Sequence, residues 1–162
     1  MGKAWIKARK HDRFYRAAKK QSYRSRAAIK LSQIDIRYGV FHESDLVVDL
    51  GAAPGGWSQI ARERIGAKGR VVAVDLARMA PKLSGNRSLD VARTLDLANA
   101  ALSFAVRALR REGRFVVKVF QGDGYRDFVR RVGERFEATK GVKPTASSAT
   151  SAEIYVLAVG RL

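Results

Sequence analysis

The sequence predicts an α/β fold built on a Rossmann-like sheet, mostly parallel, with helices on both faces and an antiparallel strand at the C-terminal end. An apolar run at 46–50 leads through a glycine-rich turn into helix-forming residues at 58–65. A second apolar run at 70–76 follows a short turn, so strand, helix and strand alternate as in a βαβ unit. Beyond a long helical pattern at 91–109, strand patterns at 114–122 and 152–160 complete the predicted sheet.

Length and composition describe one basic domain without cysteine. A chain of 162 residues is long enough for one core and too short for two domains. Its 32 lysines and arginines against 15 acidic residues give a formal charge of +17, which favours a polyanionic partner. Zero cysteines and two histidines argue against disulfides and zinc, so no metal is expected. No apolar run approaches the roughly 18 residues of a membrane-spanning helix. We therefore expect a cytoplasmic protein that does not bind membranes.

The N-terminal segment is the most basic part of the chain. Its first 30 residues hold eleven basic side chains and one acidic residue, Asp12. The basic residues are Lys3, Lys7, Arg9, Lys10, Arg13, Arg16, Lys19, Lys20, Arg24, Arg26 and Lys30. Aromatic residues are interleaved with them, and such rings stack on unpaired bases while cations contact phosphates. We predict an RNA-binding arm at 1–21, partly disordered until its partner binds, and a catalytic domain at 22–162. The alternative is a flexible tail with no specific contacts.

The turn after the first strand has the composition of a ligand-binding loop. Three glycines and one proline occupy six positions at 51–56. Glycine allows close backbone approach and positive φ, and the helix that follows points unpaired N–H groups at whatever lies over the turn. The spacing differs from the dinucleotide fingerprint, and Pro54 removes one donor, so NAD is disfavoured.

The phrase Asp49-Leu50-Gly51-Ala52-Ala53-Pro54-Gly55-Gly56-Trp57 resembles the S-adenosylmethionine loop of the RrmJ/FtsJ family of RNA ribose 2′-O-methyltransferases. The resemblance implies S-adenosyl-L-methionine as cofactor and RNA as substrate, most plausibly large-subunit ribosomal RNA or a ribosomal particle, and a monomer is expected. The cofactor-binding residues that it implies are Asp49, Gly51, Ala52, Pro54, Gly55, Gly56 and Trp57. Asp75 joins them because it lies 24 positions past Gly51, where a βαβ nucleotide unit offers a carboxylate to ribose hydroxyls.

Three further phrases resemble the family's catalytic positions. Ser25–Leu31 is similar to the helix before the core, which implies a catalytic role for Lys30. Lys118 lies in a run of Phe and Val, where burial of a lysine is costly unless it is neutral or paired, and the phrase at 117–122 is similar to the family's Val-Lys-x-Phe-Gln-Gly. Glu153 stands in a Ser-x-Glu-x-Tyr phrase, the family's place for an active-site glutamate. The implied mechanism has Lys118 as the base, Lys30 orienting the hydroxyl, and carboxylates holding the lysines.

The chain departs from the family after the second strand. Family members have two more strands there, and the second ends in Asp-Met-Ala-Pro with a catalytic aspartate, whereas this chain has Arg78-Met79-Ala80-Pro81. In one alignment a block is missing and the catalytic aspartate is absent. In the other, the strand at 70–76 replaces the catalytic strand and Asp75 becomes the catalytic acid. We predict that strand 70–76 lies beside strand 46–50 in a sheet reduced by two strands, and that strands 46–50 and 114–120 pair directly or leave a gap.

Three functions remain open from the sequence. The first is an RNA 2′-O-ribose methyltransferase. The second is a catalytically inactive RNA-binding module that keeps the methyltransferase fold, a possibility that Arg78 at the aspartate position favours. The third is a basic domain that binds DNA or a membrane surface, against which the cofactor loop argues.

Overall fold

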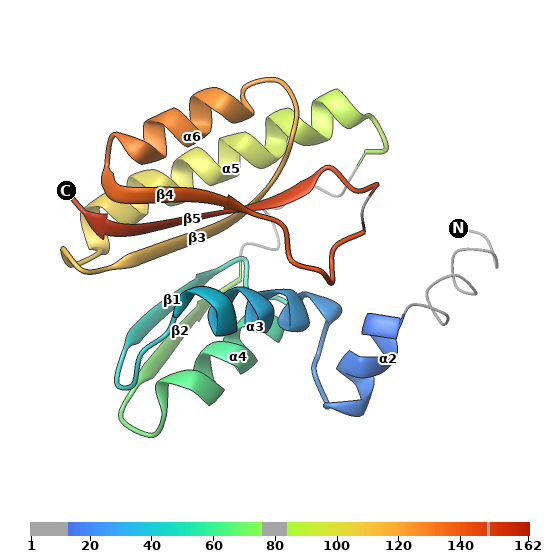
Figure 1. Cartoon of the computed structure of the whole chain (residues 1–162), viewed down its shortest axis with the longest axis vertical. Helices are drawn as coiled ribbons and strands as arrows, with labels where there is room; N and C mark the ends of the chain where they lie inside the picture. The colour runs from blue at the N-terminus through green and yellow to red at the C-terminus, as the bar shows by residue number, and fades with distance from the viewer. Residues whose placement is uncertain (1–12, 76–83, 149) are drawn as a thin grey trace. The chain divides into compact units, whose positions relative to one another are not determined.

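The structure, a computed structural model, describes residues 13–75, 84–148 and 150–162 (Figure 1). The chain divides into two compact units between Ala77 and Arg78. Unit 1 contains residues 1–77 together with 144–146, and unit 2 contains residues 78–143 and 147–162. The N-terminal half of the predicted arm and the Arg78-Met79-Ala80-Pro81 phrase lie outside the described residues.

Unit 1 is a parallel strand pair with three helices. The helices are α2 (Arg13–Lys20), α3 (Arg26–Tyr38) and α4 (Gly56–Ile65), and the strands are β1 (Leu46–Leu50) and β2 (Arg70–Val74). The strands pair in register from Leu46 opposite Arg70 to Leu50 opposite Val74, with α4 as the crossover between them. The predicted neighbourhood of these two strands is confirmed.

The helix before β1 buries a wide face. Its buried residues are Ala28, Lys30, Leu31, Ile34 and Asp35. So many positions are buried because α3 contacts both α2 and α4. Ala28 and Leu31 pack with Ile60 of α4, and Arg64 of α4 forms a 2.9 Å ion pair with Asp35.

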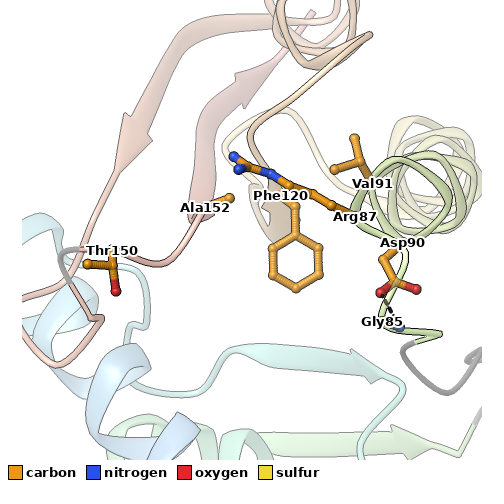
Figure 2. A pocket seen from close by; sticks show the side chains of 7 residues that line it. All are labelled: Gly85, Arg87, Asp90, Val91, Phe120, Thr150 and Ala152. Carbon is orange, nitrogen blue, oxygen red and sulfur yellow. Dashed lines mark hydrogen bonds between the residues drawn. The ribbon is translucent and has the colours of Figure 1, made fainter.

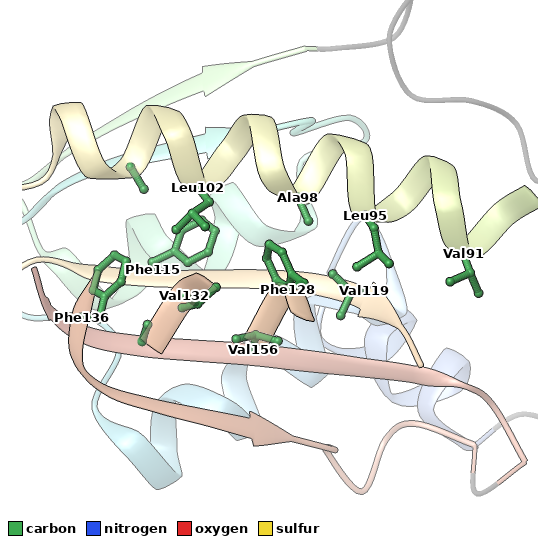
Figure 3. Close-up of a cluster of buried hydrophobic side chains, with 12 residues drawn as sticks. Val91, Leu95, Ala98, Leu102, Phe115, Val119, Phe128, Val132, Phe136 and Val156 are labelled. Atoms are coloured by element: carbon green, nitrogen blue, oxygen red, sulfur yellow. The ribbon is translucent and has the colours of Figure 1, made fainter. Parts of the chain in front are cut away.

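Unit 2 is an antiparallel three-stranded sheet with two helices on one face (Figure 1). Its elements are α5 (Arg87–Ala108), β3 (Arg114–Phe120), α6 (Tyr125–Gly133), β4 (Phe136–Val142) and β5 (Glu153–Arg161). The strand order is β3-β5-β4. Figure 3 shows its core, where Leu95 and Leu102 of α5 and Phe128 of α6 meet the apolar side chains of the strands. The C-terminal strand is antiparallel, as predicted.

The predicted α/β fold is confirmed, but its described strands are not mostly parallel. One ladder is parallel and two are antiparallel, and no ladder joins β1 or β2 to β3 in the described part of the chain. A parallel strand between the two units would need its own crossover of a dozen residues or more, and residues 77–90 are too few to supply two strands with their crossovers. β4, which the sequence pattern did not predict, instead pairs with β5 as a second antiparallel neighbour.

Candidate functional site

The turn after β1 is fixed to the end of β2 by backbone hydrogen bonds. The N–H groups of Gly51 and Ala52 both donate to the carbonyl of Val74, at 2.8 and 3.1 Å. Gly51 has φ +79°, and no atom lies within 4 Å of the position where a Cβ would stand. The backbone therefore turns out of the sheet with open space beside it, the arrangement that close approach of a ligand to the main chain requires.

Asp49 lies at the base of this turn and is buried, with 8% of its surface exposed. The hydroxyl of Ser58 in the first turn of α4 donates to Asp49 Oδ2 over 2.6 Å. A buried carboxylate needs such a partner, because an unsatisfied buried charge costs several kcal/mol. The bond also ties the strand to the helix across the turn.

The N-terminus of α4 is close-packed against α3. Gly55 precedes the helix with φ +96°, and among the described residues no side chain caps the helix start. A Cβ at Gly56 would stand too close to the hydroxyl of Ser25, the residue before α3, and this hydroxyl would have to rotate away. Trp57 packs on the adjoining cluster of Ala28, Leu31 and Ile60. The uncapped helix end leaves backbone donors for a ligand over the turn.

Asp75 follows β2 directly and is exposed. Its neighbour Val74 accepts the two hydrogen bonds from Gly51 and Ala52, so the structure brings Asp75 and the glycine turn to the same edge of the parallel pair. Lys30, by contrast, is buried in α3, with 6% of its surface exposed. The candidate cofactor residues and two of the four candidate catalytic residues, Lys30 and Asp75, thus belong to unit 1.

Glu153 opens β5 in unit 2 and is held by two hydroxyl groups. Tyr155 Oη and Ser147 Oγ both donate to Glu153 Oε1, at 3.1 and 3.3 Å. The N–H of Glu153 in turn donates to Ser151 Oγ over 3.2 Å. Alternate residues of a strand share a face, so the Ser-x-Glu-x-Tyr spacing places the tyrosine beside the glutamate. The carboxylate is consequently fixed before any substrate binds.

Lys118 is exposed, which corrects the expectation that β3 buries it. It lies opposite Tyr155 in the β3–β5 ladder, on the face of the sheet turned away from Val119, which is fully buried in the core. Its Nζ stands 5.3 Å from the ring centroid of Phe120. Because Phe120 pairs with Glu153, the lysine and the glutamate are diagonal neighbours on one face of the sheet.

A cavity of about 300 Å³ lies beside these residues within unit 2 (Figure 2). Figure 2 shows Asp90 and Gly85 on one side of it and Thr150 on the other, with Phe120 of β3 beside Arg87 and Ala152 between them. Asp90 accepts hydrogen bonds from the Ser84 N–H, the Ser84 hydroxyl and the Gly85 N–H. The Ser84 backbone N–H is the main cause of a lowered pKa for Asp90. This carboxylate therefore stays ionised and holds the start of α5.

The sequence did not indicate Ser58 or Ser147 as partners of the site carboxylates. Their signal was weak, because a serine in the first turn of a helix or in a small-residue loop is common in any fold. The described residues contain no cluster of three or more His, Cys, Asp or Glu that is placed to hold a metal ion. No helix in the described part of the chain is long and apolar enough to cross a membrane.

Comparison with known proteins identifies relatives over nearly the whole chain. A ribosomal RNA large subunit methyltransferase E from Methanocella arvoryzae is 42% identical over 191 residues, 96% of this chain and 74% of the relative. The protein of the same name from Methanobrevibacter smithii is 36% identical over 196 residues, 97% of this chain and 93% of the relative. A crystal structure of a ribosomal RNA methyltransferase from Plasmodium falciparum has a TM-score of 0.71 at 20% identity, covers 86% of this chain and 99% of its own, and supports the fold.

The same comparisons locate a missing block. The alignment with the Methanobrevibacter protein spans 196 positions and this chain has 162 residues, so at least 34 positions of that relative have no counterpart here. The family model for FtsJ-like methyltransferases matches residues 23–82 and 77–161 as two segments that overlap at 77–82. Two matches that meet at one short phrase indicate that family positions between them are absent from the chain. Together the segments cover all but the ends of the sequence, and the chain belongs to the FtsJ-like methyltransferase family.

Proposed function

We propose that this protein transfers a methyl group from S-adenosyl-L-methionine to a ribose 2′-hydroxyl of ribosomal RNA, most plausibly that of the large subunit. The observation that carries this proposal is the alignment of 96% of the chain with a protein named ribosomal RNA large subunit methyltransferase E. The net charge of +17 supports an RNA substrate.

The glycine turn of unit 1 fits the proposed cofactor. The open space at Gly51 and the backbone donors at the uncapped start of α4 suit a ligand that lies along the main chain. Asp75 at the neighbouring strand end is the carboxylate for its ribose hydroxyls, because β2 pairs with β1 and the turn is bonded to its last residue. When bound, the cofactor supplies an electrophilic methyl group on a sulfonium. This placement supports the cofactor role of Asp75 over the alternative in which it is the catalytic acid.

Lys118 is the proposed acceptor of the 2′-hydroxyl proton. Its amine is exposed on the face of β3, so it can contact a ribose hydroxyl of a bound RNA. Glu153 then orients the amine, because it lies diagonally across the ladder and is itself held by Tyr155. Lys30 is proposed to orient the 2′-hydroxyl, the role that the resemblance to the family implies.

The test is transfer of a radiolabelled methyl group from the cofactor to purified large ribosomal subunits and to free ribosomal RNA. Nuclease digestion and chromatography then show whether the label is on the 2′-oxygen. Calorimetric titration of the cofactor accompanies the assay. Cofactor binding with label on a 2′-oxygen supports the proposal. RNA binding without cofactor binding or transfer would assign the chain to the inactive module that Arg78 suggested.

A further inference from the structure

Six arginines gather at the end of unit 2 where the chain terminates. They come from three segments, namely the end of α5 with the loop into β3, the turn between α6 and β4, and the end of β5. We call them the distal arginine cluster, which consists of Arg107, Arg110, Arg111, Arg114, Arg135 and Arg161. In Figure 1 these three segments meet at the end of the sheet that carries the label C.

Backbone hydrogen bonds join the three segments. The N–H of Arg161 donates to the carbonyl of Arg111 over 2.6 Å, and the N–H of Leu162 donates to the carbonyl of Arg135 over 3.0 Å. In a third bond, the N–H of Gly160 donates to the carbonyl of Gly113 over 3.2 Å. The arginines therefore extend from a fixed backbone frame, so their spacing is set before any partner binds.

Basic side chains outnumber acidic ones in these segments. Arg107, Arg110, Arg111 and Arg135 are exposed, and the same segments contain three acidic side chains, Glu112, Glu134 and Glu137. Glu134 is engaged elsewhere, in a 2.7 Å ion pair with Arg130 of α6. Six guanidinium groups against three carboxylates leave an excess of positive charge at this end of the unit.

The cluster and the candidate catalytic residues lie at opposite ends of one ladder. Arg114 pairs with Val159, and six residues further along β3, Phe120 pairs with Glu153. At about 3.4 Å per residue, the ladder separates the two ends by roughly 20 Å. A long RNA stem spans that distance, whereas a hairpin stem of only a few base pairs does not.

We propose that the distal arginine cluster binds the phosphate backbone of the substrate RNA, about 20 Å from the target ribose. The inference rests on the proposed RNA methylation and adds a second contact region to it. Guanidinium groups bind phosphate oxygens in a bidentate manner and hold their charge at all physiological pH values. An RNA that reaches both ends of the ladder is bound more tightly than one that reaches only Lys118 and Glu153.

The experiment compares the full-length protein with two triple variants of equal charge. The cluster variant carries Arg107→Gln, Arg111→Gln and Arg135→Gln. The control variant carries Arg37→Gln, Lys68→Gln and Arg126→Gln, three exposed cations on other elements. Binding to a 20-base-pair RNA stem and to a four-base-pair hairpin is measured from 50 to 300 mM salt, and circular dichroism melting checks that each protein is folded.

For the long stem we expect the slope of log affinity against log salt to decrease by about 2–3 in the cluster variant, at roughly 0.9 per lost phosphate contact. The control variant and the short hairpin should show a much smaller change, and methylation of the short hairpin should persist in the cluster variant. Equal slopes in the two triple variants would overturn the inference. Binding of the same proteins to vesicles of anionic lipid is measured as well. An unchanged long-stem affinity together with lost vesicle binding would also overturn the inference, because the cluster would then bind lipid headgroups and not RNA. Absence of methylation by the wild-type protein would instead overturn the proposed function.

Discussion

At the scale of single residues, the proposed catalytic side chains differ in how the fold holds them. Lys30 is buried in α3, whereas Lys118 lies in β3 and is exposed. Glu153 is intermediate, with its carboxylate fixed by two hydroxyl groups. The Glu153 carboxylate is already held in position as a hydrogen-bond acceptor near the exposed Lys118 amine. Substrate binding therefore has to order only the lysine side chain, which lowers the entropic cost of assembling the site.

Replacing Lys118 with alanine tests its role as the base. We expect methyl transfer to fall by about 10²- to 10⁴-fold, the usual contribution of a general base, with cofactor affinity nearly unchanged. Lys118→Arg should not restore activity, because guanidinium does not release its proton. Single-turnover transfer and calorimetry measure the two quantities. Lys68→Ala, an exposed lysine in unit 1, is the control. Turnover close to wild type in Lys118→Ala would remove it from the mechanism.

The hydroxyl of Tyr155 should affect catalysis through Glu153. Tyr155→Phe deletes the 3.1 Å hydrogen bond and little volume, so we expect stability to fall by about 1 kcal/mol. The turnover number should decrease more than KM changes, since the carboxylate loses its orientation. Glu153→Gln combined with Tyr155→Phe should cost no more turnover than Glu153→Gln alone. Additive losses in that double variant would show that the tyrosine acts independently of the glutamate.

At the scale of elements, the start of α5 depends on an ionised carboxylate. Asp90 is partly exposed and accepts hydrogen bonds from Ser84 and Gly85, with the Ser84 N–H the main reason that its pKa is lowered. A lowered folded-state pKa contributes stability above the unfolded value of 3.8, and this contribution is lost as the pH falls through the folded value.

The free energy of unfolding of Asp90→Asn and of the wild-type protein is measured with urea from pH 7 down to pH 2.5. We expect the variant to be less stable at pH 7 and the difference to shrink below pH 3.8. Asp96→Asn, an exposed change further along the same helix, should show a smaller pH dependence. A stability gap that stays constant over this range would contradict the assignment to ionised Asp90.

Most elements were predictable because their patterns are local. The strand–turn–helix at 46–65 has apolar residues, then glycine, then helix formers, and the structure places β1 and α4 there. β4 was missed because Phe-Glu-Ala-Thr-Lys-Gly-Val carries charged residues and a glycine, and its place is set by pairing with β5. The helix α2 was missed for a similar reason, since it packs on α3 through Ala18. The strand β4 and the helix α2 thus depend on contacts with segments elsewhere in the chain, and a single sequence does not show such contacts.

Those parts of the candidate site that a short stretch of sequence encodes were predictable. The glycine turn and Asp75 meet at one strand edge because a βαβ unit brings consecutive strand ends together. The exposure of Lys118 was not predictable, because an apolar run does not show which face of its strand a neighbouring helix covers. The serines that hold Asp49 and Glu153 are likewise visible only in the folded chain.

At the scale of the whole molecule, the basic N-terminal segment has two parts. Residues 13–20 form α2, in which Ala18 is buried and contributes to packing on α3. Residues 1–12 add four further basic side chains and one acidic residue. The proposal that the segment 1–21 binds RNA is therefore best tested by removing residues 1–12 alone, which leaves the helix and its packing in place.

Deletion of residues 1–12 should weaken RNA binding without unfolding the protein. Loss of up to four phosphate contacts should lower the slope of log affinity against log salt by about 3, while the melting temperature stays close to wild type. Fluorescence anisotropy with a labelled RNA stem measures the slope, and a scrambled 1–12 segment of the same composition separates charge from sequence. An unchanged slope would show that this segment does not contact RNA.

The boundary at Ala77 and Arg78 has a consequence for how this chain tolerates its missing block. The two family matches meet at 77–82, where the two compact units also divide. Unit 1 has a small core around Ile60, and unit 2 has a larger one around Phe128. Leu46 and Val48 of β1 and Val72 of β2 are nevertheless exposed, so the parallel strand pair is not fully covered by its own helices. The absence of at least 34 family positions at this boundary therefore leaves both cores in place and leaves apolar side chains of the strand pair exposed to water.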